Sequence, residues 1–355
     1  MPFSKTLTFG SIILKQHLLI KSIFLLFLIT ACNSHEASHT EFALGTVCTV
    51  TLYDQGQPFI YNDIFTRLRE IENLMSVNIP SSDVSLINSA AGEEKVFVNK
   101  DVFYVLERAL FFASFSGGAF DPSIGPIVSL WGIGSEKSRV PSHEEIEKIL
   151  PLVNWRNIEL ETQTCCVFLK DKGMAVDLGA IAKGYAADEI AAILKKYKTD
   201  RAIIDLGGDI VVFGIKKDKS PWRVGIQNPN PGEGRGDYIG VLHIPGIENG
   251  QRTIVTSGVY ERFLEKDGRR YHHIFSPENG YPAENGLLSV TVIARLSMDA
   301  DALSTAVFVL GYENGKKLID TFPGAEAVFI FEDNSVIKTS GIDFTLTNKS
   351  YDLKP

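Results

Sequence analysis

Closely spaced short strands in the second half of the chain constrain the fold more than any other feature. From Cys165 onward, segments rich in β-branched and aromatic residues alternate with short Gly-, Asn- and Asp-containing turns, which is typical of strands joined in hairpins. Helical spacing of apolar residues interrupts this pattern at Ile181 to Lys196 and at Ala300 to Leu310. Because hairpins prevail over regular βαβ alternation, we expect an α+β fold, a single domain with a mixed, mostly antiparallel sheet and flanking helices. The predicted strands are Cys165 to Leu169, Met174 to Asp177, Arg201 to Leu206, Ile210 to Ile215, Trp222 to Gln227, Tyr238 to Ile244, Thr253 to Ser257, Tyr260 to Lys266 and Leu288 to Ala294.

The preceding part of the chain is predicted as one strand followed mainly by helices. β-Branched residues predict a strand at Glu41 to Tyr53, and interspersed Pro and Gly residues predict an ordered loop at Asp121 to Gly134. Apolar spacing and a capping-box pattern predict the helices Phe59 to Met75, Asp101 to Ser116 and Ser142 to Leu150.

The composition is that of a globular protein and argues against nucleic acid as a partner. The chain has 355 residues, of which 45% are hydrophobic, so it has ample apolar material for one large domain. Its formal net charge is −8, which gives no general attraction to nucleic acid, and no basic stripe with interleaved aromatic residues is present.

The N-terminal residues have the pattern of a lipoprotein signal. Lys15 and Lys21 precede the short apolar run Ile23 to Ile29, and the small residue Ala31 comes directly before Cys32. We therefore expect a signal peptide over residues 1–31, a lipidated Cys32 with a tether to residue 40, and the folded domain over 41–355. The expected location is a bacterial membrane surface outside the cytoplasm, facing the periplasm or the cell exterior. An ordinary signal peptide with a chance cysteine is the alternative.

Three further cysteines do not form an even framework. Cys165 and Cys166 are neighbours and would pair only with strain, and no metal-ligand spacing links them to Cys48. We interpret all three as small strand residues, and a disulfide of Cys48 with either of the others stays open.

The segment Tyr271 to Pro282 contains two adjacent histidines beside a turn stiffened by prolines. In a strand, His272 and His273 point to opposite faces, so at most one of them faces a given site. Taken alone, either histidine is more often structural than functional.

Two glycine-rich turns are candidates for binding an anionic or hydroxylated ligand. Asp177 to Gly184 follows a predicted strand and opens a helix, whose free amides and dipole favour an anion, although a tight turn with a surface Lys183 explains the pattern too. Asp205 and Asp209 flank a Gly-Gly hairpin turn and could receive ribose or ring hydroxyl groups.

The start of the predicted helix near Asp299 carries a possible metal set. Asp299 is a plausible N-cap, and Asp301 gains from the helix dipole. Asp301 and Thr305 are four residues apart and share a face, and a carboxylate with a hydroxyl suits Mg²⁺ once carbonyl, water and phosphate oxygens complete the shell.

Taken together, these segments resemble the FAD:protein FMN transferase (ApbE) family over nearly all of the chain that follows the signal. Each motif is modest alone, and their number and order carry the resemblance. The motifs are Leu44-Gly45-Thr46, Ser85-Leu86-Ile87-Asn88, Gly117-Gly118-Ala119-Phe120-Asp121-Pro122, Asp177 to Gly184, Asp205 to Asp209, Thr256-Ser257-Gly258, His273 to Pro282, and Asp301 to Thr305.

The resemblance implies a flavin-binding domain of the T-fold-like ApbE type and a Mg²⁺-dependent transfer reaction. FAD is split, FMN is attached by a phosphoester bond to a Thr or Ser of an exported acceptor protein, and AMP is released. By matching positions, His273 is the catalytic residue, and Ala180 (through its carbonyl), Asp301 and Thr305 are the metal ligands. The implied FAD-binding residues are Leu44, Asn78, Asp121, Asp177, Lys183, Asp205, Ser257, Gly258, His273 and Ile274.

Two positions depart from the family pattern. Ser276 stands where the family usually has Asp before the proline of the histidine motif, which removes electrostatic support for His273. Asn78 lies in the loop where many members carry an aromatic residue, so a stacking contact of about 1 kcal/mol is lost and water could enter. We therefore expect hydrolysis of FAD to FMN and AMP to compete with transfer.

Three other functions are weighed against the transferase. A dedicated FAD pyrophosphatase would use the same site with water as the nucleophile. A flavin-binding lipoprotein without turnover would not need the set of Asp301, Thr305 and His273. A solute-binding lipoprotein would show a two-lobed βαβ pattern, which the sequence lacks.

Overall fold

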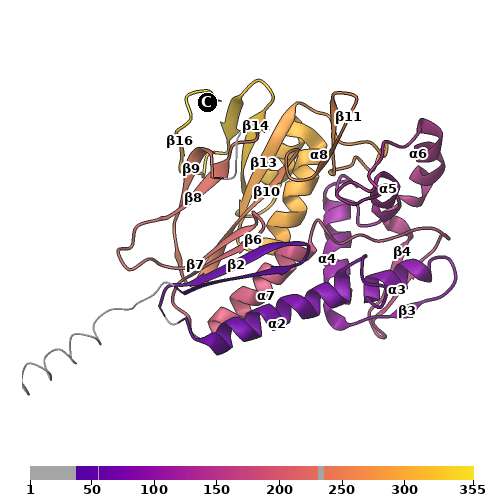
Figure 1. The fold of residues 1–355 in the computed structure, drawn as a ribbon, viewed down its shortest axis with the longest axis horizontal. Helices are drawn as coiled ribbons and strands as arrows, with labels where there is room; N and C mark the ends of the chain where they lie inside the picture. Colours follow the sequence, from indigo (N-terminus) through magenta and orange to yellow (C-terminus); the bar gives the residue numbers. More distant parts are fainter. Residues whose placement is uncertain (1–36, 55, 231–235) are drawn as a thin grey trace, which may run out of the picture. The chain divides into compact units, whose positions relative to one another are not determined.

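A nine-stranded sheet with the strand order β1-β2-β6-β7-β10-β13-β14-β15-β17 organises the protein (Figure 1). The structure is a computed structural model that describes residues 37–54, 56–230 and 236–355. Neighbouring strands pair antiparallel except β15 and β17, which confirms the predicted mostly antiparallel α+β fold. The strands are β1 (Ala37–Ala43), β2 (Thr46–Leu52), β6 (Ala202–Leu206), β7 (Ile210–Gly214), β10 (Ile247–Gly258), β13 (Leu287–Ala294), β14 (Glu326–Phe331), β15 (Ser335–Lys338) and β17 (Asp352–Leu353).

Alternating side chains of this sheet feed two separate cores. On one face, Val255 and Val290 belong to the large core built with the helices α2 (Pro58–Met75), α4 (Lys100–Phe115), α7 (Ala182–Lys196) and α8 (Ser297–Thr321). On the other face, Ile254 and Ile293 pack against a three-stranded sheet of β16 (Phe344–Leu346), β9 (Tyr238–Ile244) and β8 (Trp222–Gln227).

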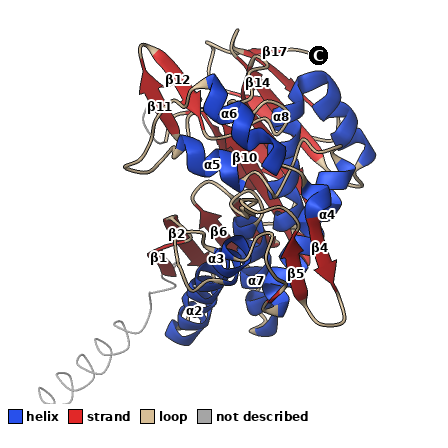
Figure 2. Ribbon diagram, turned by 90° about the vertical axis from the view of Figure 1, so that its right-hand side faces the viewer, coloured by secondary structure: helices blue, strands red, loops and turns tan. Residues whose placement is uncertain are grey.

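Smaller elements surround the site end of the molecule (Figure 2). Trp131, Phe275 and Ile146 form a third, local core between short helices and a hairpin. These elements are the helices α3 (Asp83–Ser89), α5 (Gly125–Trp131) and α6 (His143–Ile149), the 3₁₀ turns η1 (Leu150–Leu152) and η2 (Trp155–Asn157), the hairpin of β11 (Phe263–Lys266) and β12 (Arg269–His272), and the sheet of β3 (Val96–Phe97), β5 (Cys166–Leu169) and β4 (Ile158–Glu161).

The first predicted strand is two strands in the structure. Leu44 has φ 53 and Gly45 φ 68, and this left-handed pair turns the chain between β1 and β2. Because β1 begins at Ala37, the folded unit starts four residues earlier than the predicted boundary at 41, and the expected tether is correspondingly shorter. The expected signal peptide and Cys32 lie outside the described residues.

Other boundaries also differ from the prediction. The segment predicted as a loop at Asp121 to Gly134 contains helix α5, since Pro126 stands in the first turn, where proline is tolerated. Met174 to Asp177 forms only an isolated bridge between Ile124 and Ala175. Helix α8 runs from Ser297 past a non-helical Gly311, and the strands after Ala294 were not predicted.

The three cysteines of the described residues are free, so neither disulfide is formed. Cys48 lies in β2, whereas Cys165 and Cys166 lie at the start of β5 in another sheet. Within the described part of the chain, we find no helix that is both long and apolar enough to span a membrane.

Candidate active site

The two adjacent histidines at the end of β12 have different environments. His272 is buried, its Nδ1 accepts from the Ile274 amide at 3.2 Å, and its Nε2 lies 3.0 Å from the Ala283 carbonyl. Since a carbonyl only accepts, Nε2 carries the proton and both ring nitrogens are used. His272 is therefore the structural histidine of the pair. The buried Ile274 anchors the same turn.

His273 has one committed and one available ring nitrogen. Its Nδ1 lies 3.1 Å from the carbonyl of Arg262, so Nδ1 carries the proton and Nε2 presents a lone pair. Burial and then the Arg262 guanidinium lower the pKa of His273 to about 4. The ring is thus a neutral base held in one tautomer. No sequence pattern points to this support, because it comes from the main chain of Arg262.

Ser276 does not take the place of the missing carboxylate. Its main chain closes a tight turn, since its amide donates to the Tyr281 carbonyl and its carbonyl accepts from the Gly280 amide, both at 2.8 Å. The orienting hydrogen bond to His273 comes from Arg262 instead.

Three turns at one end of the large sheet meet beside His273. Arg262 reaches the Gly45 carbonyl in the β1–β2 turn at 3.5 Å, and Gly207 of the β6–β7 turn lies against Thr46. Asp205 is held in that second turn because it accepts from the Gly208 amide at 2.9 Å. Since antiparallel neighbours bring these strand ends together, the structure gathers the predicted residues Leu44, Asp205, Ser257, Gly258 and His273 at one sheet end.

The Asp177 to Gly184 turn opens helix α7 without a side-chain cap. Asp177 accepts from the Gly179 amide at 2.7 Å, and its own amide donates to the Pro122 carbonyl at 2.8 Å. Burial raises the pKa of Asp177. The turn is therefore fixed against the segment that contains Asp121.

Asp121 is occupied by its own loop. Its carboxylate accepts from the Ser123 amide and hydroxyl at 2.8 and 2.6 Å and from the Trp155 amide at 3.2 Å. Only 8% of the residue is exposed, and burial raises its pKa. It shapes the loop that faces Asp177.

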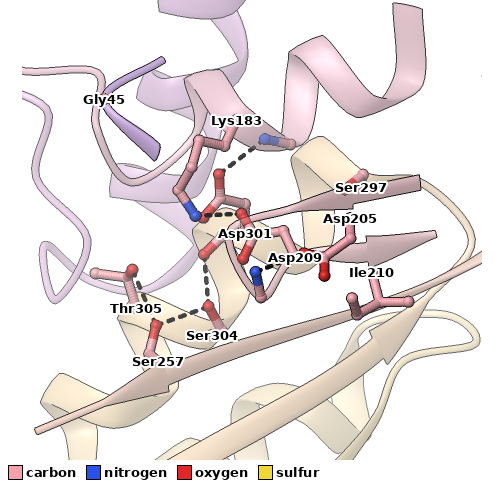
Figure 3. A network of polar contacts seen from close by, with 12 residues as sticks. Gly45, Lys183, Asp205, Asp209, Ile210, Ser257, Ser297, Asp301, Ser304 and Thr305 are labelled. Carbon is pink, nitrogen blue, oxygen red and sulfur yellow. Dashed lines mark hydrogen bonds and ion pairs between the residues drawn. The ribbon is translucent and has the colours of Figure 1, made fainter. Parts of the chain in front are cut away.

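Two buried carboxylates and one ammonium group form the centre of the polar network in Figure 3. Lys183 pairs with Asp209, which is 2% exposed and therefore not available for a ribose hydroxyl. Asp301 is 4% exposed and accepts from the Gly184 amide at 2.9 Å. Burial, with Asp209 as the next cause, raises the pKa of Asp301 to about 7. One ammonium group thus faces two carboxylates, which leaves excess negative charge when both are ionised.

Hydroxyl groups continue this network toward the sheet (Figure 3). Ser257 Oγ on β10 lies 2.8 Å from Ser304 Oγ and 3.4 Å from Thr305 Oγ1 on α8. Ser304 also donates to the Asp301 carbonyl at 2.9 Å, so it fixes the first turns of α8. The sequence analysis did not single out Ser304, although it lies inside the Asp301 to Thr305 motif.

The donor set around Asp301 suits a hard divalent cation. It combines a buried carboxylate in excess negative charge with the Thr305 hydroxyl one helical turn away, and the partly buried Ala180 precedes α7, whose Gly184 amide contacts Asp301. Carboxylate, hydroxyl and carbonyl oxygens are ligands that Mg²⁺ accepts. The described residues contain no cluster of three His, Cys, Asp or Glu side chains for a metal that prefers nitrogen or sulfur.

Two predicted residues have other positions. Asn78 is exposed in the turn after α2, where its amide donates to Ser76 Oγ at 3.2 Å. Asp299 is not the N-cap of α8: the cap is Leu296, and Asp299 pairs with Arg108 at 2.7 Å.

The fold and the site define a class of protein. A neutral histidine base, an uncapped helix start and a buried carboxylate–hydroxyl set meet in an α+β domain, which is the equipment of an enzyme that acts on a phosphate ester.

Comparisons with known proteins identify the family. The ApbE family model matches residues 44–329, and the chain belongs to this family. It is 39% identical to the FAD:protein FMN transferase of Treponema pallidum over 324 residues, covering 86% of this chain and 88% of that protein. It is 36% identical to the Klebsiella pneumoniae enzyme of the same name over 303 residues, covering 85% and 92%.

Solved structures agree with this assignment. The ApbE protein of Thermotoga maritima superimposes with a TM-score of 0.77 at 34% identity, covering 86% of this chain and 97% of that one. The flavin transferase ApbE of Vibrio cholerae gives a TM-score of 0.73 at 26% identity, covering 88% and 97%.

Proposed function

We propose that this protein is a FAD:protein FMN transferase, which moves FMN from FAD to a Thr or Ser hydroxyl of an acceptor protein and releases AMP. The observation that carries the proposal is the state of His273, whose Nδ1–H is tied to the Arg262 carbonyl while Nε2 is left unprotonated. A hydroxyl nucleophile requires such a base within reach. The names of the relatives support the reaction and its two substrates.

The transfer is a substitution at the FMN phosphorus. The acceptor oxygen bonds to this phosphorus while its proton passes to Nε2 of His273. The phosphorus–oxygen bond toward AMP breaks, and its electron pair stays on the bridging oxygen of the departing AMP. The proton then leaves the imidazolium for AMP or water, which the low pKa of His273 favours. FAD and a protein hydroxyl thus give a protein–FMN phosphoester and AMP, with no change in oxidation state.

Asp301, Thr305 and the Ala180 carbonyl would hold Mg²⁺. When bound, the ion would neutralise pyrophosphate charge as the substitution proceeds. Lys183 and Asp209 fix the buried wall behind this set, and the free amides at the start of α7 offer further donors to a phosphate.

The FAD-binding surface comprises side chains and turns of different kinds. Ser257 offers a hydroxyl, and Gly258 leaves room because a Cβ there would lie 2.7 Å from the Tyr260 ring. The full proposed set is Leu44, Asn78, Asp121, Asp177, Lys183, Asp205, Ser257, Gly258, His273 and Ile274.

The protein is proposed to act outside the cytoplasm, held on a bacterial membrane by a lipid on Cys32. The support is the sequence pattern of Lys21, the apolar run to Ile29, and Ala31 before Cys32. The acceptor would then be an exported protein. Metabolic labelling with a fatty acid that is lost in Cys32→Ser would support the anchor, and labelling retained in that variant would refute it.

The deciding experiment mixes the purified portion from Asn33 onward with FAD and Mg²⁺, with and without a candidate acceptor. AMP together with FMN mass on the acceptor establishes the transferase. AMP and free FMN with no acceptor modification would make the protein a pyrophosphatase, and bound but unchanged FAD would make it a flavin-binding lipoprotein.

A further inference from the structure

An exposed apolar pair lies on the outer face of the β1–β2 hairpin. Phe42 is 74% exposed and Val47 47% exposed, and the two residues stand directly opposite each other across the strands. Their chain neighbours Ala43 and Cys48 point the other way and are buried in the large core. The pair is therefore displayed by the alternation of a well-packed hairpin, not by a loose terminus.

The face that carries Phe42 and Val47 has no charged side chain. Its other members are hydroxyl residues paired across the strands, with Thr40 and Thr49 at 2.9 Å and Thr51 donating to Ser38 at 3.2 Å. The second core, which covers this face of the sheet farther along, includes no residue of β1 or β2. Within the described chain, this end of the sheet is uncovered.

β1 is also open along its edge. It pairs only with β2 in the described sheet, and its sequence Ala37–Ala43 contains neither the lysine nor the proline that commonly protects an edge strand. An edge strand with a flat, uncharged face is the type of surface to which an extended peptide adds as a further strand.

The hairpin face is continuous with the catalytic base. Phe42 lies just before the turn whose Gly45 carbonyl accepts from Arg262, and the carbonyl of the same arginine holds His273. Summed along this path, Phe42 and Nε2 of His273 are at most about 25 Å apart, which about eight residues of extended chain can span.

We propose that the outer face and edge of the β1–β2 hairpin are the docking surface for the acceptor protein. The occupant is an extended, uncharged segment next to the modified Thr or Ser, which pairs with β1 and packs an apolar side chain on Phe42 and Val47. The inference rests on the proposed transferase function, because a protein acceptor has to bring its hydroxyl to His273. Absence of charge on this face selects against acidic or basic segments.

The test compares two equally exposed phenylalanines. Phe42→Asp places a charge on the proposed surface, and Phe97→Asp is the matched control, since Phe97 is 75% exposed on the separate β3–β5–β4 sheet. The probe is the exported protein of the same organism that gains the mass of FMN, purified in its unmodified form. Acceptor affinity is measured by calorimetry, and transfer by the kcat/KM for the acceptor.

We expect Phe42→Asp, and separately Val47→Asp, to weaken acceptor binding and lower kcat/KM at least tenfold, with FAD affinity and thermal unfolding unchanged. Equal acceptor binding by Phe42→Asp and Phe97→Asp would overturn the proposal. If the parent binds the acceptor but performs no transfer, the proposed function fails, whereas the calorimetric comparison still decides the docking surface. A change in oligomeric state with Phe42→Asp, without a change in acceptor binding, would assign the face to a second copy and also overturn it.

Discussion

The roles of the two adjacent histidines are decided by their partners. We expect His273→Gln to lower the transfer rate by about 10²- to 10⁴-fold, because glutamine can donate to the Arg262 carbonyl but cannot accept the proton. FAD affinity, measured by fluorescence quenching, should stay within about twofold. His272→Gln is the control: it should lower the melting temperature, since a buried residue loses paired contacts, but leave the rate of the folded enzyme within about threefold. Equal losses of rate in the two variants would contradict these roles.

The pH profile reports the same environment. Because burial and then Arg262 lower the pKa of His273 to about 4, the base stays unprotonated well below neutral pH. At saturating Mg²⁺, the acid limb of kcat/KM should have its midpoint near 4, not near the ordinary histidine value of about 6.5. Arg262→Gln keeps the main-chain carbonyl and removes the cation, so its midpoint should move upward. An acid limb at the ordinary value in both proteins would show that the cation has no effect.

Asn78 should influence the competition between transfer and hydrolysis. It is exposed in the turn after α2, at the position where the family resemblance expects an aromatic residue. Asn78→Tyr should lower acceptor-independent AMP release several-fold and tighten FAD binding by about 1 kcal/mol, because an aromatic ring can stack on the flavin or adenine and exclude water. Asn78→Ala is the matched variant and should hydrolyse FAD like the parent. Hydrolysis by Asn78→Tyr at the parental rate would remove Asn78 from the explanation.

At the scale of elements, helix α8 is held by a cap that comes from another helix. Leu296 gives no side-chain cap, whereas Asp188 of α7 accepts from the Ser297 and Met298 amides at 2.8 and 2.9 Å. Asp188→Ala should cost about 1–2 kcal/mol of unfolding free energy and should weaken Mg²⁺ binding several-fold, since α8 carries Asp301. Calorimetric Mg²⁺ titration checks this.

A cap elsewhere separates the two effects of Asp188→Ala. Asn99 caps α4 by accepting from the Asp101 amide at 2.9 Å, so Asn99→Ala removes a comparable cap far along the sequence from α8. It should cost similar stability without changing Mg²⁺ affinity. Mg²⁺ affinity lowered equally in both variants would reduce Asp188 to a residue of general stability.

Much of this architecture was predictable because local patterns decide it. The apolar spacing of α2 and α7 and the capping box of Ser142 carry information in the sequence itself. The turn at Leu44 was not predictable, because its positive φ is imposed by pairing of β1 with β2.

The candidate site divides in the same way. Motif residues such as Asp301 and His273 could be identified from the sequence, whereas the Arg262 carbonyl is main chain and leaves no pattern. The pairing of Asp209 with Lys183, residues 26 positions apart, depends on how α7 packs beside the β6–β7 turn. Non-local contacts of this kind decide which motif residues remain free for a substrate.

For the whole molecule, the site is assembled without help from a metal but at some cost in stability. Asp301 is buried beside Asp209, and its pKa is raised to about 7 from the ordinary 3.8. Stability from its protonated form is fully present below the ordinary pKa and is lost as the pH rises through about 7. The metal-free protein should therefore become less stable between about pH 4 and 7 through this group.

Asp301→Asn tests this balance between stability and function. The amide carries no charge, so the metal-free variant should be more stable than the parent at pH 8 by about 1 kcal/mol or more, and the pH-dependent loss should be reduced. Mg²⁺ should raise the melting temperature of the parent, and more so at pH 8 than at pH 6, because a ligand that binds the ionised carboxylate competes with protons. It should leave Asp301→Asn unchanged and inactive in transfer. Thermal unfolding of both proteins with Mg²⁺ or a chelator at the two pH values measures all of this. A variant that is less stable than the parent without metal, yet is still stabilised by Mg²⁺, would show that Asp301 is a structural residue and that the cation binds elsewhere.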